Sequence, residues 1–178
     1  KDVAAKINAV SGSTGVTATA ETYAHLLSTG SAESYVVEIN GTETASFSIS
    51  STDVTGAVTA INAISSTTGV NASATTDFKV LLHDADGDDI TIQNKSASLA
   101  NLDVYAVKRD GLTTQGNTAT DLAVVSGNSA TRVVGTLRLI SDASFSVTQS
   151  GTSTLGYLVT GTSSQSAISS LDLSTAIK

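Results

Sequence analysis

The sequence contains no cysteine, methionine, proline or tryptophan, and aromatic residues make up only 4% of it. The lack of cysteine excludes disulfides and thiolate metal sites. Because large aromatic side chains are scarce, Val, Ile, Leu and Ala have to fill the interior. A primary translation product begins with methionine, so we expect this chain to be a fragment or a processed product.

Clustered positive charge is also missing. Nine basic residues stand against sixteen acidic ones, the net charge is −7, and Lys108 and Arg109 are the only adjacent basic pair. Proteins that bind nucleic acid rely on clustered Lys and Arg, so this pattern argues against a nucleic-acid partner. No apolar run approaches the roughly 20 residues of a membrane-spanning helix, and no basic segment followed by an apolar one indicates a signal peptide. The sequence therefore predicts no membrane association.

Serine and threonine are abundant instead, and together they account for 54 of the 178 residues. Many alternate with apolar residues, which is typical of strands in a sheet with one wet and one buried face. A chain of this length forms one large domain or two small ones and can bury well over half of its unfolded surface. The composition therefore favours a β-rich domain over a catalytic α/β core.

An internal repeat organises the chain. Residues 7–20 align without gaps to residues 61–74, at an offset of 54 residues, and are identical at nine of the fourteen positions. Such repeats indicate a duplicated structural unit. Each copy carries an Ile-Asn pair and, eight residues later, a Gly-Val pair. These residues are Ile7, Asn8, Gly15 and Val16 in the first copy, and Ile61, Asn62, Gly69 and Val70 in the second.

Each copy predicts a short helix, a glycine stop and a strand. In the second copy, apolar residues at 54, 58, 61 and 64 share one helical face, and residues 51–53 offer N-cap side chains. Gly69 suits the left-handed conformation that ends a helix, and an apolar period of two follows it. We therefore expect an α+β fold of mainly antiparallel strands with two short helices, built from a duplicated helix-glycine-strand module.

Most of the remaining chain is expected to form strands. Asn40 and Gly41 predict a tight turn in a hairpin, and Asp86 and Gly87 predict a turn between two further strands. The expected strands cover residues 16–20, 23–27, 35–40, 45–50, 78–83, 89–93, 102–107, 133–140, 145–149 and 155–160, with one short element at 122–125.

Several stretches resemble the central, surface-exposed region of bacterial flagellins. The two Ile-Asn-Ala … Thr-Gly-Val-x-Ala-x-Ala stretches at 7–20 and 61–74 are similar to the flagellin hook IN motif. The Ile-Asn-Gly at 39–41 and the strand pair around 86–92 match the usual neighbours of that motif. Residues 135–147 and 169–176 resemble the segments by which flagellins return toward their C-terminal helix. Residues 109–130 resemble nothing in this family.

The resemblance implies a structural subunit of the bacterial flagellum, secreted and extracellular, that serves motility. Its partners would be other flagellin subunits, bound through terminal helices absent from this fragment, and no cofactor is implied. We expect residues 1–34 with 131–178 to form a stalk-proximal lobe and residues 35–130 an inserted outer lobe. The two ends of the chain should lie close together, and the isolated fragment should be monomeric.

Two alternatives remain open. The IN motif also occurs in the filament cap protein, although the segment around residues 171–175 favours flagellin. A secreted adhesin module that binds glycan or host protein would need a concave site with aromatic or amide side chains. The four tyrosines (Tyr23, Tyr35, Tyr105 and Tyr157) are isolated in the sequence.

Catalytic motifs are lacking, and we expect no enzyme. The only histidines, His25 and His83, belong to no Gly-x-Ser-x-Gly or His-Glu-x-x-His motif, and both fall in expected strands. We also expect the amides of Asn8 and Asn62 to bond to loop backbone rather than to a ligand.

Asp84, Asp86 and Asp88, followed by Asp89, form the sharpest acidic cluster. Oxygen-rich loops of this kind can hold Ca²⁺. The full spacing of an EF-hand is absent, however, and Asp-Gly is itself a turn signal. We therefore expect a solvated hairpin tip and no metal, with this cluster as the weak Ca²⁺ candidate.

Overall fold

The protein is described from a computed structural model, which covers residues 1–28, 33–97, 101–116, 118–123, 129–147 and 161–162. All paired strands in this part of the chain are antiparallel, and the four helices are short. The expected α+β fold of mainly antiparallel strands is therefore confirmed.

The four helices are α1 (Asp2–Ala9), α2 (Ser11–Thr14), α3 (Thr55–Asn62) and α4 (Ser65–Thr68). The strands are β1 (Thr17–Ser28), β2 (Glu33–Tyr35), β3 (Val37–Ile39), β4 (Thr42–Glu43), β5 (Phe47–Ile49), β6 (Val70–Ala74), β7 (Val80–Asp84), β8 (Ile90–Asn94), β9 (Leu102–Val107), β10 (Thr120–Leu122), β11 (Ala130–Val133), β12 (Thr136–Ile140), β13 (Ser146–Val147) and β14 (Gly161–Thr162).

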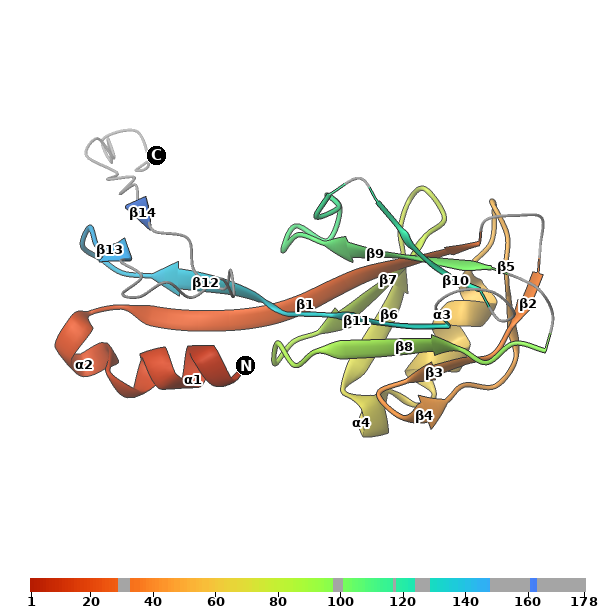
Figure 1. Cartoon of the computed structure of the whole chain (residues 1–178), viewed down its shortest axis with the longest axis horizontal. Helices are drawn as coiled ribbons and strands as arrows, with labels where there is room; N and C mark the ends of the chain where they lie inside the picture. Colours follow the sequence, from red (N-terminus) through yellow and green to blue (C-terminus); the bar gives the residue numbers. More distant parts are fainter. Residues whose placement is uncertain (29–32, 98–100, 117, 124–128, 148–160, 163–178) are drawn as a thin grey trace, which may run out of the picture.

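Strand β1 joins the two parts of the molecule. Figure 1 shows it running from a narrow arm, which holds α1, α2 and β12, into a broader lobe. Its first residues, Thr17 to Glu21, pair with β12, and the residues from Thr22 onward pair with β7 and β9. The main sheet has the order β10-β9-β1-β7-β6, with β12 attached to β1. Both parts are therefore built on one continuous strand.

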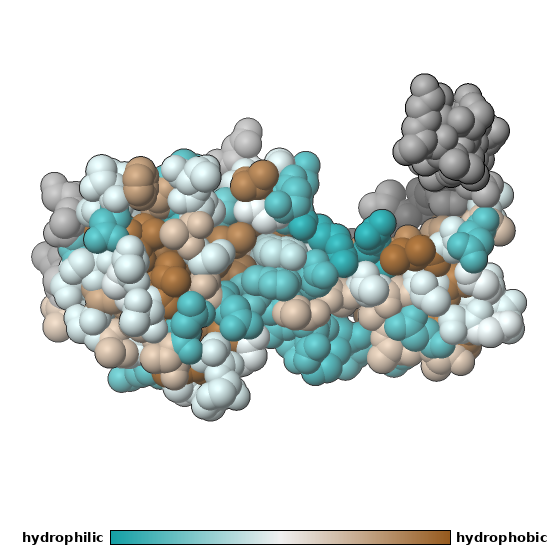
Figure 2. Space-filling view, turned by 180° about the vertical axis from the view of Figure 1, so that it is seen from behind, coloured by the Kyte–Doolittle hydropathy of each residue, from teal (hydrophilic) through white to brown (hydrophobic). Residues whose placement is uncertain are grey.

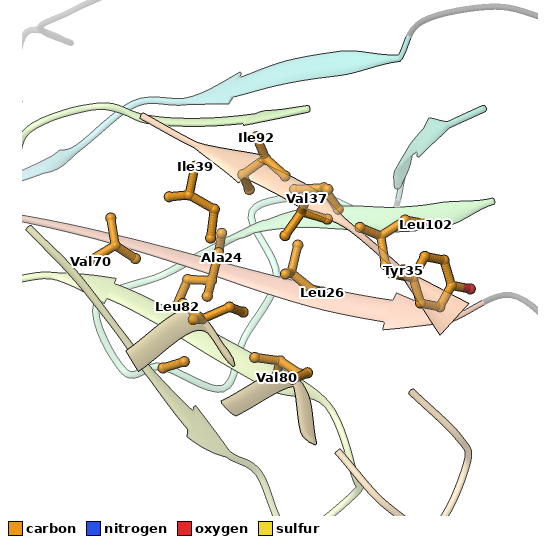
Figure 3. Close-up of a cluster of buried hydrophobic side chains, with 14 of the residues drawn as sticks. Ala24, Leu26, Tyr35, Val37, Ile39, Val70, Val80, Leu82, Ile92 and Leu102 are labelled. Carbon is orange, nitrogen blue, oxygen red and sulfur yellow. The ribbon is translucent and has the colours of Figure 1, made fainter. Parts of the chain in front are cut away.

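The core of the lobe lies between the main sheet and a second sheet of order β11-β8-β3-β4. Ala24 and Leu26 of β1 face Val37 and Ile39 of β3 and Ile92 of β8 (Figure 3). Helix α3 packs against β5 and β6. Of the apolar face predicted from the helical spacing, Val54, just before the helix, and Ile61 are buried, and Val58 and Ile64 are partly buried. Ala57 and Ala60 of the helix are buried as well.

The first expected strands are one strand, not two. Residues 16–20 and 23–27 are expected as separate strands, but β1 runs without a break from Thr17 to Ser28. In the structure Thr22 is buried on the core side and its hydroxyl donates to the Asp88 carbonyl at 2.7 Å. Conversely, the single strand expected at 133–140 is two strands, β11 and β12, which lie on either side of Gly135.

The strand-turn-strand prediction at 78–93 gave the strands but not their pairing. β7 and β8 follow one another and lie in different sheets. The turn between them presses against β1: a side chain at Gly87 would collide with Ala20, and one at Gly135 would lie 2.7 Å from the Gly87 carbonyl oxygen. The chain passes from one sheet to the other at this close contact.

The hairpin prediction at 35–50 is correct around its turn. Asn40 and Gly41 have φ angles of 47° and 82° and connect β3 to β4. β5 leaves this hairpin and pairs with β2 instead. The expected stalk-proximal lobe includes residues 1–34. Within this range, the half of β1 from Thr22 onward pairs with β7 and β9 of the broader lobe. The expected strand at 155–160 and Lys178 lie outside the described residues.

Candidate functional site

The two repeats share the hydrogen bonds that their asparagines make to the following strand. Asn8 donates from Nδ2 to the Ala18 carbonyl at 2.8 Å and accepts the Ala18 N–H at 2.7 Å. Asn62 makes the same pair of bonds to Ala72, at 2.9 and 2.7 Å. Each asparagine therefore connects the end of a helix to the backbone of the following strand, where loop backbone was expected.

Each asparagine also occupies an open edge of a sheet. β6 is the last strand of the main sheet, and the N–H and C=O of Ala72 that reach Asn62 point away from its neighbour β7. Ala18 stands in the part of β1 that pairs with β12 on one side only. Unpaired edge groups are templates for pairing with other chains. The amide takes the place of a neighbouring strand at one residue of each edge.

The turn between helix and strand is repeated as well. Thr14 and Thr68 each donate to a carbonyl four residues earlier, at 3.1 Å in both copies, and accept the N–H of the valine two residues later at 3.2 Å. Gly15 and Gly69 have φ angles of 67° and 75°, as the left-handed end of a helix requires. The expected glycine stop is present in both copies.

The copies differ in their surroundings. In α3, Gly56 lies against the backbone of β5, because an added Cβ would be 3.7 Å from the Ser48 backbone, and Ala60 is buried. At an offset of 54 residues, α1 carries Asp2 and Lys6 at these positions, and both are exposed. The second module is therefore part of the lobe core, whereas the first covers one face of the arm.

Asn40 ties the second module to the neighbouring sheet. Its Nδ2 donates to the Thr68 carbonyl at 2.9 Å, and its Oδ1 accepts the Thr91 N–H at 2.8 Å. The Asn-Gly signal predicted the turn but not this bridge, because the partners lie 28 and 51 residues away in the sequence. No local pattern could have indicated it.

The acidic cluster is already engaged within the chain. Asp84 is 3% exposed, and its Oδ1 accepts the N–H groups of Asp86 and Asp88 at 3.0 and 3.1 Å. Lys1 Nζ lies 2.9 Å from Asp88 and 3.7 Å from Asp86. Hydrophilic residues gather where the arm meets the lobe (Figure 2). In the described residues, no group of three His, Cys, Asp or Glu side chains could hold a metal ion.

Both histidines lie in strands on the face of the main sheet that points away from the core. His25 of β1 is 2% exposed, and its Nε2 lies 3.1 Å from the Gly111 carbonyl oxygen. Burial lowers the pKa of His25, and the bond to Gly111 opposes this only in part. The ring of His83 stacks on Tyr23, with centroids 4.3 Å apart.

Tyr35 lies in the core, apart from Tyr23 and Tyr105, which share the opposite face of the main sheet. Tyr35 is 1% exposed and its hydroxyl donates within the lobe to Ser28, at 2.9 Å. Burial raises its pKa. Tyr23 donates to Glu21 at 3.0 Å, next to the ion pair of Glu21 with Arg109. Tyr157 lies outside the described residues.

No helix among the described residues has the length and apolar character needed to cross a membrane. In comparisons with known proteins, no family model matches this chain, and no curated protein matches it either.

Proposed function

We propose that this chain forms the surface-exposed outer domains of a flagellin, the structural subunit of the bacterial flagellar filament, and has no catalytic role. The observation that carries the proposal is the duplicated module, because a motif similar to the flagellin IN motif recurs with the same bonds around Asn8 and Asn62. Such fidelity supports a unit selected for its shape.

The shape of the molecule supports the same role. Figure 1 shows an elongated chain in which one module lies in the arm and the other in the lobe. Polar side chains next to the second module, such as Asp84 and Thr68, bond to backbone groups. A rigid, Ser- and Thr-rich body of this kind suits the outside of a secreted polymer whose subunits join through terminal helices elsewhere.

Immunogold electron microscopy tests the proposal. Antibodies raised against the 178-residue chain, applied to cells that carry its gene, should label filaments along their whole length. Label only at filament tips would favour the cap protein, and label spread over the cell surface would favour an adhesin; either result would overturn the proposal. Preimmune serum is the control.

The isolated chain should also be monomeric, since its polymerising contacts are proposed to lie in other segments. Sedimentation velocity over a wide concentration range should give one species of constant mass. Fibres that form with rising concentration would contradict this expectation.

A further inference from the structure

We propose that residues 108–114, here named the flap, form a pH-sensitive cover that lies on the outer face of the main sheet while His25 is neutral and lifts from it when the imidazole is protonated. The outer face is the side of β1, β7 and β9 that points away from the core. It carries His25 and Tyr23 of β1, Leu81 of β7 and Tyr105 of β9.

The flap is a small hairpin with its own internal bonds. Lys108 N donates to the Thr113 carbonyl at 2.7 Å, and Thr114 forms a bridge with Val107. Asp110 accepts the N–H groups of Leu112 and Thr113 at 2.9 and 2.8 Å. The base of the flap is fixed by Gln115, whose N–H and side chain donate to β9. The hairpin can therefore move as a unit about its base.

Three contacts hold the flap on the sheet. The Gly111 carbonyl accepts from His25, and Gly111 lies close to Leu81, since an added Cβ would lie 3.3 Å from the Leu81 side chain. Arg109 pairs with Glu21 at 2.9 Å. Gly111 is buried beneath the tip, whereas Leu112 beside it is 71% exposed. His25 thus supplies the only one of these three contacts that changes with protonation near neutral pH.

The hydrogen bond fixes the tautomer of His25. A carbonyl oxygen only accepts, so Nε2 carries the proton and Nδ1 is bare in the neutral ring. Nδ1 is buried and has no partner. Protonation would place an N–H and a positive charge at this atom, in a site that is 2% exposed. Lifting the flap would admit water to the ring and relieve the desolvation.

The charges around His25 leave this conclusion unchanged. Burial is the largest influence and lowers the pKa of His25, although the bond to Gly111 favours the protonated ring; Lys79 opposes protonation, and Asp77 and Asp110 favour it. The pKa values of Asp77 and Asp110 are about 2, because both carboxylates accept hydrogen bonds from neighbouring residues. These two carboxylates stay charged while His25 titrates. The other titratable or charged groups on this face are Tyr23, Tyr105, His83, Asp103 with Asp121 opposite it, and the Glu21–Arg109 pair.

An NMR titration of the whole chain tests the proposal. Between about pH 8 and 4.5, the ring signals of His25 and the amides of Gly111 and Leu112 should change with one midpoint below the ordinary His value of 6.5. Each unit of that difference corresponds to about a tenfold change in the closed-to-open ratio on protonation. Core amides such as Leu82 should not move.

Two variants sharpen the test. In His25→Gln, a side chain that can still donate to Gly111 but does not titrate replaces the imidazole, and the flap amides should lose their transition. The matched control His83→Gln should keep it. Arg109→Gln removes one anchor without touching His25, so the midpoint should move up toward 6.5.

Flap amides that stay still while His25 titrates would overturn the proposal. So would a transition that survives His25→Gln, or core amides that move at the same midpoint as the flap. If His25→Gln does not fold, the titration of the wild-type chain and of Arg109→Gln decides the question.

Discussion

The amide of Asn62 should stabilise the lobe by joining α3 to the edge of β6. Replacing Asn62 with alanine removes a donor and an acceptor that lie 2.9 and 2.7 Å from the backbone of Ala72. Ala72 is 9% exposed, so its freed N–H and C=O have little access to water. The variant therefore loses two bonds and leaves two polar groups poorly solvated.

The size of the loss follows from these bonds. A hydrogen bond contributes about 0.5–1.5 kcal/mol net. Because Asn62 itself is exposed and water can replace part of what is lost, we expect a total of about 1.5 kcal/mol. For a chain of this size, 1 kcal/mol shifts the melting temperature by about 2–4 °C. Asn62→Ala should therefore melt about 3–6 °C below the wild-type chain.

Thermal and urea unfolding followed by circular dichroism measure this loss. Asn71→Ala is the matched control, because Asn71 is an exposed asparagine on β6, next to Ala72. Asn62→Asp keeps the acceptor but sets a carboxylate oxygen against the Ala72 carbonyl, so it should lose at least as much as Asn62→Ala. If Asn62→Ala and Asn71→Ala melt within about 1 °C of each other, the amide does not support the fold in this way.

Two further substitutions test other features by the same unfolding measurements. Gly69→Ala should destabilise the chain more than Gly15→Ala. Both positions need a positive φ, which costs alanine about 1–2 kcal/mol, but only at Gly69 would the added Cβ lie 3.1 Å from Asp84 Oδ2. Equal losses of stability would contradict this crowding. Asp103 lies opposite Asp121 on paired strands, and burial, followed by the charge of Asp121, raises its pKa. A raised carboxyl pKa contributes stability at low pH that is lost as the pH rises through the folded-state value, so Asp121→Asn should gain about 0.5 kcal/mol at pH 7 and much less near pH 3; a gain that does not depend on pH would refute the repulsion.

The modules could be predicted from the sequence because their signals are local. The helical spacing of Ile61, the glycine stop at Gly69 and the alternation after it lie within a few residues of one another, and the structure has each of them. The role of Asn62 was predicted only in part: a hydrogen bond from its side chain to backbone was expected, but not that this backbone is the edge of β6. The identity of that edge depends on β7, which pairs with β6 from the other side.

The continuity of β1 could not be predicted because its evidence is non-local. Positions 18, 20, 22, 24 and 26 all point to one face, but alanine and threonine give a weak apolar signal. In the middle of the strand, the Thr22 hydroxyl donates to the Asp88 carbonyl and Arg109 donates to the Glu21 carboxylate. These partners lie 66 and 88 residues away in the sequence. The crossing of β7 to β8 likewise depends on Gly87 meeting Ala20.

The two modules share their internal hydrogen bonds but differ in how their helices pack. The bonds around Asn8 and Asn62 agree within 0.1 Å, so the sequence of the module sets them wherever it is placed. The burial of the two helices differs, however: Ala57 is fully buried, whereas Val3, at the corresponding position of α1, is 46% exposed. The charged Asp2 stands at the position of Gly56, which lies against β5, and Lys6 stands at the position of the buried Ala60. A strand like β5 could not cover α1 without burying these charges, so the first module keeps the edge-capping asparagine while its helix stays at the surface of the arm.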